Sequence, residues 1–325
     1  MQERRSDYDV TNSVRTTDPA AVAAEVRRIY IDLYRKAGAD NLERPFRDFA
    51  ALYAGEHPDY YGCDTGYHDV QHVLDVTLTM ARLLDGYERV GREPLGERLF
   101  RLGVILALYH DIGYLRHRKD TRHRHGAEYT RTHVSRGERF LQTYLPQVGM
   151  ADVAPGASRV VHFTGFEIPA DQIKLSQPIF RVIGNLLGSA DILGQMADRC
   201  YLEKCHDRLY PEFELGGIAR RRNAQGKEEV MFGSAADLIA KTPAFYQAAA
   251  HRLDAILGCA YRYAEQHFGG PNHYVEAVEK NIGYARKIGA SVDLSSLRRH
   301  APPLLAAVYQ LGREQEAEQA QRQLI

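Results

Sequence analysis

Residues 67–113 open with YHDVQHVLDV at 67–76 and close with LYHDIG at 108–113, and two apolar helical patterns lie between these ends. The first pattern runs from 68 to 85 and the second from 97 to 111. Apolar residues fill nearly every position of 102–108, which predicts a helix buried on most sides. The chain therefore carries its histidine and aspartate pairs on helices that we expect to form the core.

Helical spacing continues on both sides of this stretch. Asp18 followed by Pro19 is typical of a helix start. Residues 1–17 are polar and aperiodic and are expected to form a flexible arm, and residues 211–233 are predicted to be a loop with room for a short hairpin. The sequence has neither an internal repeat nor sustained strand alternation, so the predicted fold class is all-α. Further helices are predicted at 45–52, 127–145, around 160–162, and at 178–209, 243–269, 273–288 and 302–319.

Composition narrows the classes of protein that the chain can belong to. The 325 residues carry 42 basic and 42 acidic side chains, a balance that argues against binding duplex nucleic acid over the whole surface. The four cysteines form no CxxC pair, and the N-terminal residues lack the apolar segment of a signal peptide. No apolar run approaches the roughly 20 residues that span a bilayer. These features predict a cytoplasmic protein that partners neither a membrane nor duplex nucleic acid.

Histidines and aspartates in these helices are candidate metal ligands. His68 and His72 lie four residues apart, so both project from one face of a helix. His110 and Asp111 put two kinds of ligand side by side at the end of the apolar helix, where a lone aspartate is costly and a bound cation would remove the cost. Histidine with carboxylate suits Mn, Fe, Co, Ni or Zn. The alternative is a set of helix-surface side chains without a metal.

These motifs resemble those of the HD superfamily of metal-dependent phosphohydrolases. The segment at 67–76 is similar to the first motif of class I cyclic-nucleotide phosphodiesterases, Tyr-His-Asn-x-x-His-Ala-x-Asp-Val. HDIG at 110–113 resembles the signature pair of the superfamily, and GSAD at 188–191 resembles its last motif. The resemblance covers about residues 60–200. It implies a metal-binding HD-domain helical bundle at 18–210, followed by the 211–233 loop and a C-terminal helical extension at 234–325.

The resemblance also implies roles for the motif residues. His72, His110, Asp111 and Asp191 would hold one metal ion, and Asp111 would bridge to a second. A hydroxide held between the two divalent ions (Mn, Fe, Mg, Co, Ni or Zn) would attack phosphorus, and His68 would protonate the leaving oxygen. Asp111 and His68 are thus the implied catalytic residues.

Two more histidines are candidate ligands of the second metal. His133, in the segment HVSRGERFL, resembles the His-Pro-x-x-Gly segment of HD-GYP proteins, and His162 lies about where that class has its next histidine. The GYP motif itself is absent from the sequence. The order His, His-Asp, His, His, Asp also fits the HD-type diiron oxygenases. For each histidine the alternative is a helix-face side chain bonded to a backbone carbonyl.

Three side chains are candidates for substrate binding. Tyr114 stands where many relatives have lysine, and it either bonds a substrate phosphate or packs. Arg116 begins a basic loop at 116–125, which either attracts an anionic substrate or is a solvated loop. Arg199 follows Asp191 on the same predicted helix.

The sequence therefore predicts a metal-dependent phosphohydrolase, specifically a phosphodiesterase that acts on a nucleotide or cyclic nucleotide. The alternatives are a diiron oxygenase on the same ligands and a non-catalytic nucleotide-binding module. A small phosphoester is the expected partner, and the polar C-terminal tail leaves a homodimer open.

Overall fold

The computed structural model describes residues 3–35, 42–90, 93–165, 167–222, 226–291 and 294–304. It confirms the all-α fold class, because the sheet within these ranges is a single antiparallel pair of β1 (Arg220–Arg222) and β2 (Glu228–Val230). None of the described helices is both long and apolar enough to cross a membrane. The α-helices are α1 (Pro19–Tyr34), α2 (Glu43–Tyr53), α3 (Val70–Val90), α4 (Gly96–Leu108), α5 (His133–Gln147), α6 (Ala154–Ala157), α7 (Ile179–Met196), α8 (Tyr201–Lys204), α9 (Tyr210–Leu215), α10 (Ala235–His251), α11 (Tyr263–Phe268) and α12 (His273–Ser291).

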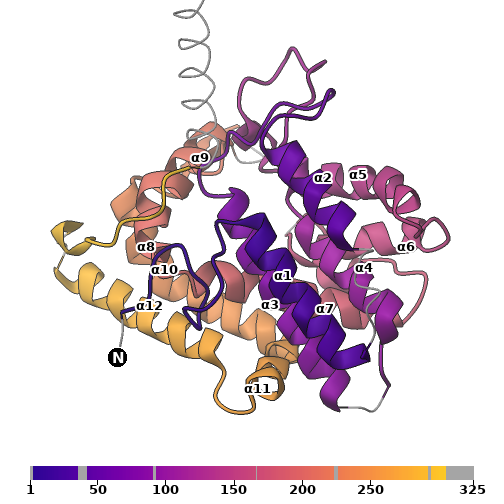
Figure 1. Ribbon diagram of the computed structural model, residues 1–325. Helices are drawn as coiled ribbons and strands as arrows, with labels where there is room; N and C mark the ends of the chain where they lie inside the picture. Colours follow the sequence, from indigo (N-terminus) through magenta and orange to yellow (C-terminus); the bar gives the residue numbers. More distant parts are fainter. Residues whose placement is uncertain are drawn as a thin grey trace, which may run out of the picture.

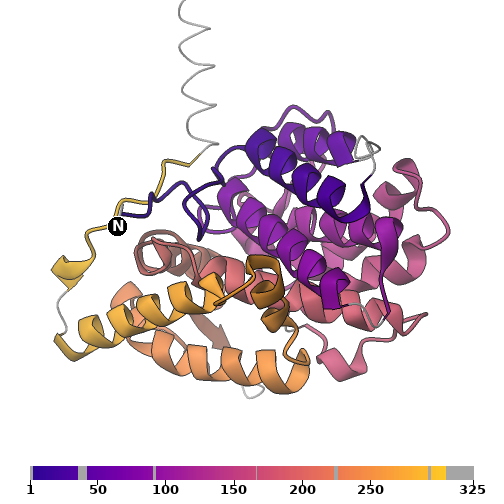
Figure 2. The same ribbon diagram turned by 60° about the horizontal axis from the view of Figure 1, so that its bottom comes forward.

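Helix α3 is the central element of the bundle (Figure 1). It is buried on nearly all faces and packs against α1, α4, α7 and α11, which surround it in both views (Figure 2). The helical pattern predicted at 68–85 continues through Gly86 to Val90. A Cβ at Gly86 would lie only 1.8 Å from the carbonyl oxygen of Tyr263, so the glycine permits the close contact with α11.

Some helix boundaries differ from the predicted ones. The Asp18 side chain caps α1 as expected, by accepting a hydrogen bond from the amide of Ala20. The predicted helix at 178–209 is interrupted, since α7 ends at Met196 and α8 begins only at Tyr201. The Ser234 side chain caps α10, so this helix begins before Pro243, the residue predicted to start it.

The 211–233 stretch contains the short hairpin that the prediction allowed, formed by β1 and β2, but it begins with most of helix α9 instead of a loop. Residues 302–304 are not helical, and the rest of the helix predicted at 302–319 lies outside the described residues. The C-terminal helices α11 and α12 pack on α3 and α7, so the chain after the hairpin contacts the helices that carry the motifs.

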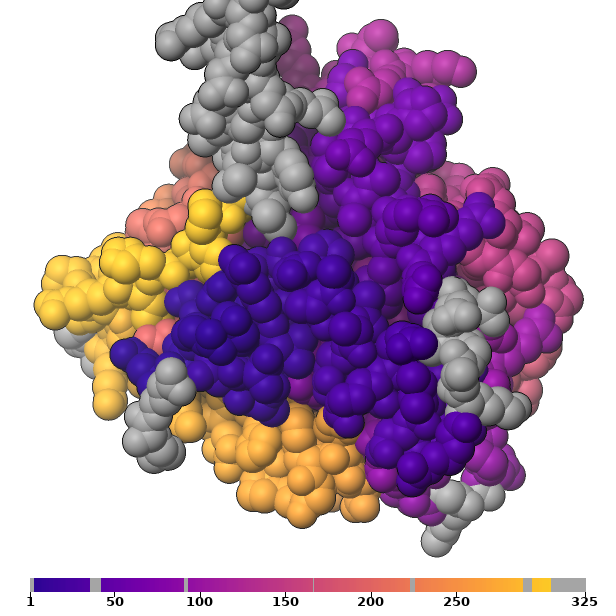
Figure 3. Space-filling view, viewed as in Figure 1, coloured from indigo at the N-terminus to yellow at the C-terminus, as the bar shows by residue number. Residues whose placement is uncertain are grey.

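The N-terminal residues are held on the bundle, which contradicts the predicted flexible arm for residues 3–17. Asp9 is 2% exposed and accepts a hydrogen bond of 2.6 Å from the Arg82 guanidinium of α3. Arg82 is also 2% exposed, and its other terminal nitrogen donates to the hydroxyl of Tyr274 on α12. Figure 3 shows the N-terminal residues covering one face of the molecule beside the C-terminal segment. A buried arginine required a carboxylate partner, which the sequence pattern of residues 1–17 did not reveal.

Because of this ion pair, we expect the free energy of unfolding to decrease in acid. Burial opposes ionisation of Asp9, but the Arg82 guanidinium and the hydrogen bonds from Thr11 and Val14 outweigh it and lower the pKa of Asp9 from 3.8 to about 2. The ionised carboxylate therefore stabilises the fold above pH 3.8, and this contribution is lost as the pH falls towards 2. Asp9→Asn should cost about 3–5 kcal/mol near neutral pH, because it leaves Arg82 buried without its counter-charge.

Urea unfolding between pH 2 and 7 measures this effect. The difference between wild type and Asp9→Asn should shrink as the pH falls through the range in which Asp9 gains its proton. Asp7→Asn is a suitable control, because Asp7 pairs with Arg15 on the surface. Equal stability of the Asp9 variant and the wild type at neutral pH would show that the pair does not anchor the N-terminal segment.

Candidate metal centre

Short-range structure places three predicted ligands at the ends of helices. Asp69 accepts a hydrogen bond of 3.0 Å from the amide of His72, which fixes the first turn of α3. His110 and Asp111 follow directly after the last turn of α4. A helix end turns the backbone sharply, so His110 and Asp111 can point into the same space although they are adjacent in sequence. His72, His110 and Asp111 are all buried, with 6%, 1% and 3% of their surfaces exposed.

The ligand atoms of these residues face one another and could hold a metal ion. His72 Nε2 and His110 Nε2 lie 3.4 Å apart, and Asp111 Oδ2 is 3.1 Å from the first and 3.3 Å from the second. Two ligand atoms that each lie about 2.1 Å from one metal ion are separated by roughly 3.0–3.4 Å in octahedral or tetrahedral geometry. The side chains therefore already have the spacing of a coordination shell.

The hydrogen bonds around this group leave the required lone pairs available. His110 Nδ1 lies 2.7 Å from the carbonyl oxygen of Ala107, so this nitrogen carries the proton and Nε2 is the coordinating atom. Asp111 Oδ2 accepts no hydrogen bond although it is buried. A buried carboxylate oxygen that faces two imidazole nitrogens is suited to a cation.

Asp191 on α7 lies next to the same group. Its Oδ1 is 3.6 Å from His72 Nε2 and 3.8 Å from His110 Nε2. Burial opposes the charged form of His110, but the carboxylates of Asp111 and Asp191 outweigh it and raise the pKa of His110 from 6.5 to about 9. The shift of His110 shows that the two acids favour positive charge at the centre of the group. Burial works against the charge of Asp191 and raises its pKa.

His133 approaches the group from the other side of Asp111. Its Nδ1 lies 2.8 Å from the Thr130 carbonyl oxygen, which leaves the Nε2 lone pair facing Asp111 Oδ1 at 3.5 Å. Gly113 makes this approach possible, because a Cβ there would lie 1.8 Å from the carbonyl oxygen of His133. The glycine of the HDIG motif therefore allows the start of α5 to lie against the histidine–aspartate pair.

His68 is held by Glu212, a residue outside the sequence motifs. Its Nδ1 lies 2.6 Å from Glu212 Oε2, and the other carboxylate oxygen of Glu212 accepts from the amide of Tyr67. Burial lowers the pKa of His68, but the charge and hydrogen bond of Glu212 outweigh this effect and raise it. Glu212 falls in a stretch that was predicted to be a loop, so no sequence signal connected it with His68.

Tyr114 packs between two histidines of the site. Its ring stacks on His68 at a centroid distance of 4.5 Å and on His133 at 4.3 Å, with interplanar angles of 19° and 18°. The structure shows that the ring packs, and a bond from its hydroxyl to a substrate phosphate stays a prediction. A rigid three-ring stack restricts the rotation of both imidazoles.

His162 is not brought to this group, and its prediction as a ligand is therefore contradicted. Its Nε2 lies 2.8 Å from Glu138 Oε2, and the ring is 1% exposed. The short helix at 158–163 is a 3-10 helix rather than the α-helix predicted around 160–162, and its tighter turns change the side-chain directions. His162 is therefore bonded within the protein, as the alternative interpretation proposed, although its partner is a carboxylate and not a backbone carbonyl.

The position of His162 gives a prediction about metal binding. His162→Gln should leave metal stoichiometry unchanged but lower stability by about 1–3 kcal/mol, because Glu138 loses a hydrogen bond in a largely buried place. Metal analysis and thermal unfolding of the same sample measure both effects. A matched His72→Gln variant should lose the metal. Loss of metal in the His162 variant with its fold intact would restore this residue to the ligand set.

Two predicted substrate residues also lie elsewhere. Arg116 donates to Asp64 at 2.9 Å and lies over the ring of Tyr61. Arg199 pairs with Glu3 and lines a separate surface depression. The interruption between α7 and α8 changes the helical phase, so Arg199 does not share a face with Asp191 as a continuous helix would predict.

A cavity of about 560 Å³ opens onto the ligand group. Its polar part contains His72 of α3, Asp111 and Tyr114 after α4, His133 of α5 and Asp191 of α7. His68 also lines it, but this residue precedes α3 and does not share a helix face with His72 as predicted. The size lies within the range typical of small-molecule sites. The cavity gives a ligand access to both the metal-binding group and His68.

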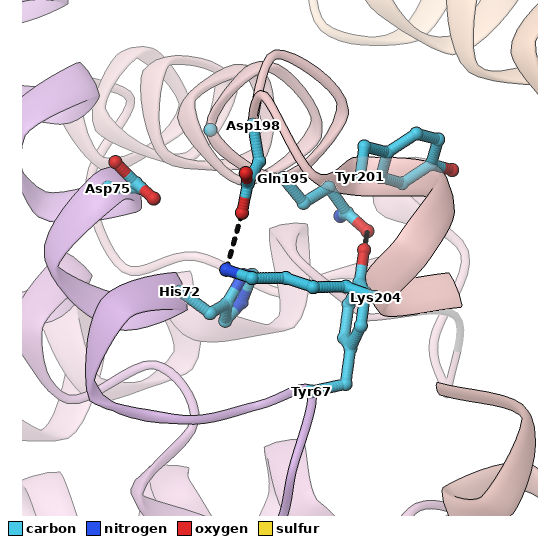
Figure 4. A pocket seen from close by; sticks show the side chains of 8 residues that line it. Tyr67, His72, Asp75, Gln195, Asp198, Tyr201 and Lys204 are labelled. Carbon is cyan, nitrogen blue, oxygen red and sulfur yellow. Dashed lines mark hydrogen bonds and ion pairs between the residues drawn. The ribbon is translucent and has the colours of Figure 1, made fainter. Parts of the chain in front are cut away.

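A second, much smaller cavity borders His72 on the side of α8 (Figure 4). The Lys204 ammonium donates to Asp198 at 2.5 Å and to Gln71 at 2.8 Å. Figure 4 also shows the Tyr67 hydroxyl directed at Gln195, at 3.3 Å. With about 10 Å³ of space, this cavity cannot hold a substrate, so its buried charges fix the elements around His72.

Comparisons with known proteins give no match. No protein-family model matches the chain, and no curated protein or solved structure is significantly similar to it.

Proposed function

We propose that this protein is a metal-dependent phosphohydrolase that cleaves phosphodiesters, with nucleotides and cyclic nucleotides among the candidate substrates. The observation that carries the proposal is the spacing of 3.1–3.4 Å among the ligand atoms of His72, His110 and Asp111. These atoms border a cavity large enough for a substrate. The HD-superfamily motifs in the sequence supply the reaction class.

The side chains around Asp111 would hold two metal ions in this proposal. His72, His110 and Asp111 Oδ2, with Asp191 nearby, would hold the first ion. Asp111 Oδ1 and the Nε2 lone pair of His133, which are 3.5 Å apart, would contribute to the second. When bound, such ions would lower the pKa of water and neutralise charge on phosphate oxygens.

In the proposed reaction, the side chain of His68 supplies the proton for the leaving group. In hydrolysis, a P–O bond forms with the oxygen of water while the P–O bond to the alcohol breaks, and the departing alkoxide needs a proton. Glu212 holds Nδ1 of His68, so Nε2 is the nitrogen free to face the cavity. His68 would give its proton to the leaving oxygen, and the proton released by water restores the balance.

The diiron oxygenase is the alternative function on the same ligands. Both functions assigned His162 to the second metal, so the bond of that ring to Glu138 does not distinguish between them.

A chromogenic phosphodiester tests the proposal. Protein loaded with Mn²⁺ should release 4-nitrophenolate from bis(4-nitrophenyl) phosphate, and protein treated with chelator should not. Metal-loaded protein that binds Mn²⁺ but releases no product would refute the hydrolase. Oxygen consumption by the iron-loaded protein would then support the oxygenase, and failure to bind any metal would support a non-catalytic module.

A further inference from the structure

The wall of the large cavity that comes from residues 209–245 is apolar. Its side chains belong to the turn before α9, to α9 itself, to the segments flanking the hairpin, and to α10: Leu209, Phe213, Ile218, Phe232, Leu238 and Phe245. None of the predicted metal ligands comes from this stretch. The cavity thus combines a metal-binding group from one part of the chain with an apolar surface from another.

Aromatic packing and one lysine hold this wall in place. The rings of Phe213 and Phe232 stack with a centroid distance of 5.5 Å and an interplanar angle of 28°. Lys241 lies over the ring of Phe232 and donates to the carbonyl oxygen of Met231 at 2.8 Å and to Asp237 at 2.9 Å. The lysine ties the end of the hairpin to α10, so its ammonium stabilises the wall.

The threonines that line the cavity use their hydroxyl protons within the protein. Thr130 donates to the carbonyl oxygen of Ala127 at 2.6 Å, and Thr164 donates to that of Val161 at 2.8 Å. Thr242 likewise donates to a carbonyl one turn earlier in α10.

The two arginines that line the cavity also bond to the chain. Arg131 donates to the carbonyl oxygen of Gly217 at 2.5 Å. Arg252 donates to the carbonyl oxygens of Phe163 and Gly165 at 2.7 and 3.0 Å. These hydrogen bonds join the hairpin region and the 158–165 segment to their neighbours. A nucleobase needs donors and acceptors placed along its edge, whereas each of these threonines and arginines bonds to a backbone carbonyl of the protein.

We infer that the substrate is a phosphoester whose second organic group is bulky, apolar and without hydrogen-bonding edges, and that this group packs on Phe213, Phe232 and Phe245. The inference rests on the proposed function, and it narrows the substrate class from nucleotides to esters of apolar or aromatic alcohols. The phosphate would lie at the metal group, where the charge is needed, and the apolar group would lie on the 209–245 wall.

Three esters with the same leaving group test the inference in Mn²⁺-loaded protein. They are methyl, phenyl and thymidine 5′-(4-nitrophenyl) phosphate, and each releases 4-nitrophenolate. Burial of an aromatic ring contributes enough free energy for about a 10- to 100-fold preference, so kcat/KM should rise by that factor from methyl to phenyl. The thymidine ester should fall below the phenyl ester. A thymidine ester preferred over the phenyl ester would overturn the inference and leave the hydrolase standing.

Variants locate the preference on the wall. Phe232→Ala should bring the phenyl-to-methyl ratio of kcat/KM close to one. Phe245→Ala, at an exposed rim position, should lower the ratio without risk to folding. Val230→Ala is the matched control, because Val230 is 54% exposed and does not line the cavity. An unchanged ratio in both phenylalanine variants would place the apolar group elsewhere and refute the assignment.

A binding measurement separates failure of this inference from failure of the proposed function. Phenylphosphonate and methylphosphonate carry the same anionic group and cannot release an alcohol. Calorimetry on Mn²⁺-loaded protein should give tighter binding of phenylphosphonate and a negative heat-capacity change from apolar burial. Such binding without any hydrolysis would refute the hydrolase alone. Equal affinities for the two phosphonates would refute the apolar subsite, whatever the activity.

Discussion

Replacing His110 with alanine is expected to remove the bound metal and abolish hydrolysis. His110 Nε2 lies within 3.4 Å of His72 Nε2 and of Asp111 Oδ2, so its loss opens one side of the ligand group. Loss of a residue that only orients a ligand costs 10- to 100-fold in affinity, and loss of the ligand itself should cost more than about 100-fold. Mass spectrometric metal analysis after dialysis, together with Mn²⁺ titration, measures the effect.

Asp111→Asn tests the same site with little change of shape. The amide keeps the volume of the side chain but removes the negative charge that faces two imidazoles. His273→Ala is the control for histidine removal, because its side chain is 40% exposed on α12. Circular dichroism must show that each variant is folded. Wild-type metal affinity in a folded His110→Ala protein would mean that the ligand group has been assigned to the wrong residues.

Replacing His68 with alanine is expected to preserve metal binding and slow turnover by about 10²–10⁴, the range of general acid catalysis. The loss should depend on the leaving group. An alkyl alkoxide needs a proton to depart, whereas 4-nitrophenolate is a stable anion and needs little help. A dialkyl phosphate should therefore lose far more rate than bis(4-nitrophenyl) phosphate.

Glu212→Gln should produce the same dependence with a smaller loss. The amide can still hold the His68 ring, but it no longer stabilises the charged imidazole. A uniform loss for both kinds of leaving group would indicate that His68 and Glu212 only shape the cavity. Loss of metal from His68→Ala would instead make His68 a ligand.

The sequence predicted those parts of the molecule that depend on local pattern. Apolar spacing was enough to predict an all-α fold, and His110 and Asp111 drew attention because charge at the end of an apolar helix is expensive. The structure brings both residues together with His72, as the motifs suggested. Helical spacing predicts the direction of a side chain over one or two turns. His72, His110 and Asp111 each lie in a clearly predicted helix or within one turn of its end.

Other parts depend on tertiary contacts that one sequence does not display. Glu212 reaches His68 across 144 residues, and Asp9 reaches Arg82 across 73. Arg199 was placed by extending α7 through a break that begins after Met196. His162 lies in a 3-10 helix, where side-chain directions differ from those of an α-helix, and its ring bonds to Glu138. Each of these differences arises where the direction of a side chain depends on distant packing.

The division of the cavity between two stretches of chain has an evolutionary consequence. Residues 68–191 contribute the candidate reactive side chains, and residues 209–245 contribute the surface opposite them. Glu212 is the exception in the later stretch, because it holds His68. Mutations at the apolar positions of this stretch can accumulate with less effect on the reactive groups, so new preferences can arise there by drift and selection at little catalytic cost. Homologous proteins that share the earlier stretch would then be expected to diverge first in what they accept, and only later in what they do to it.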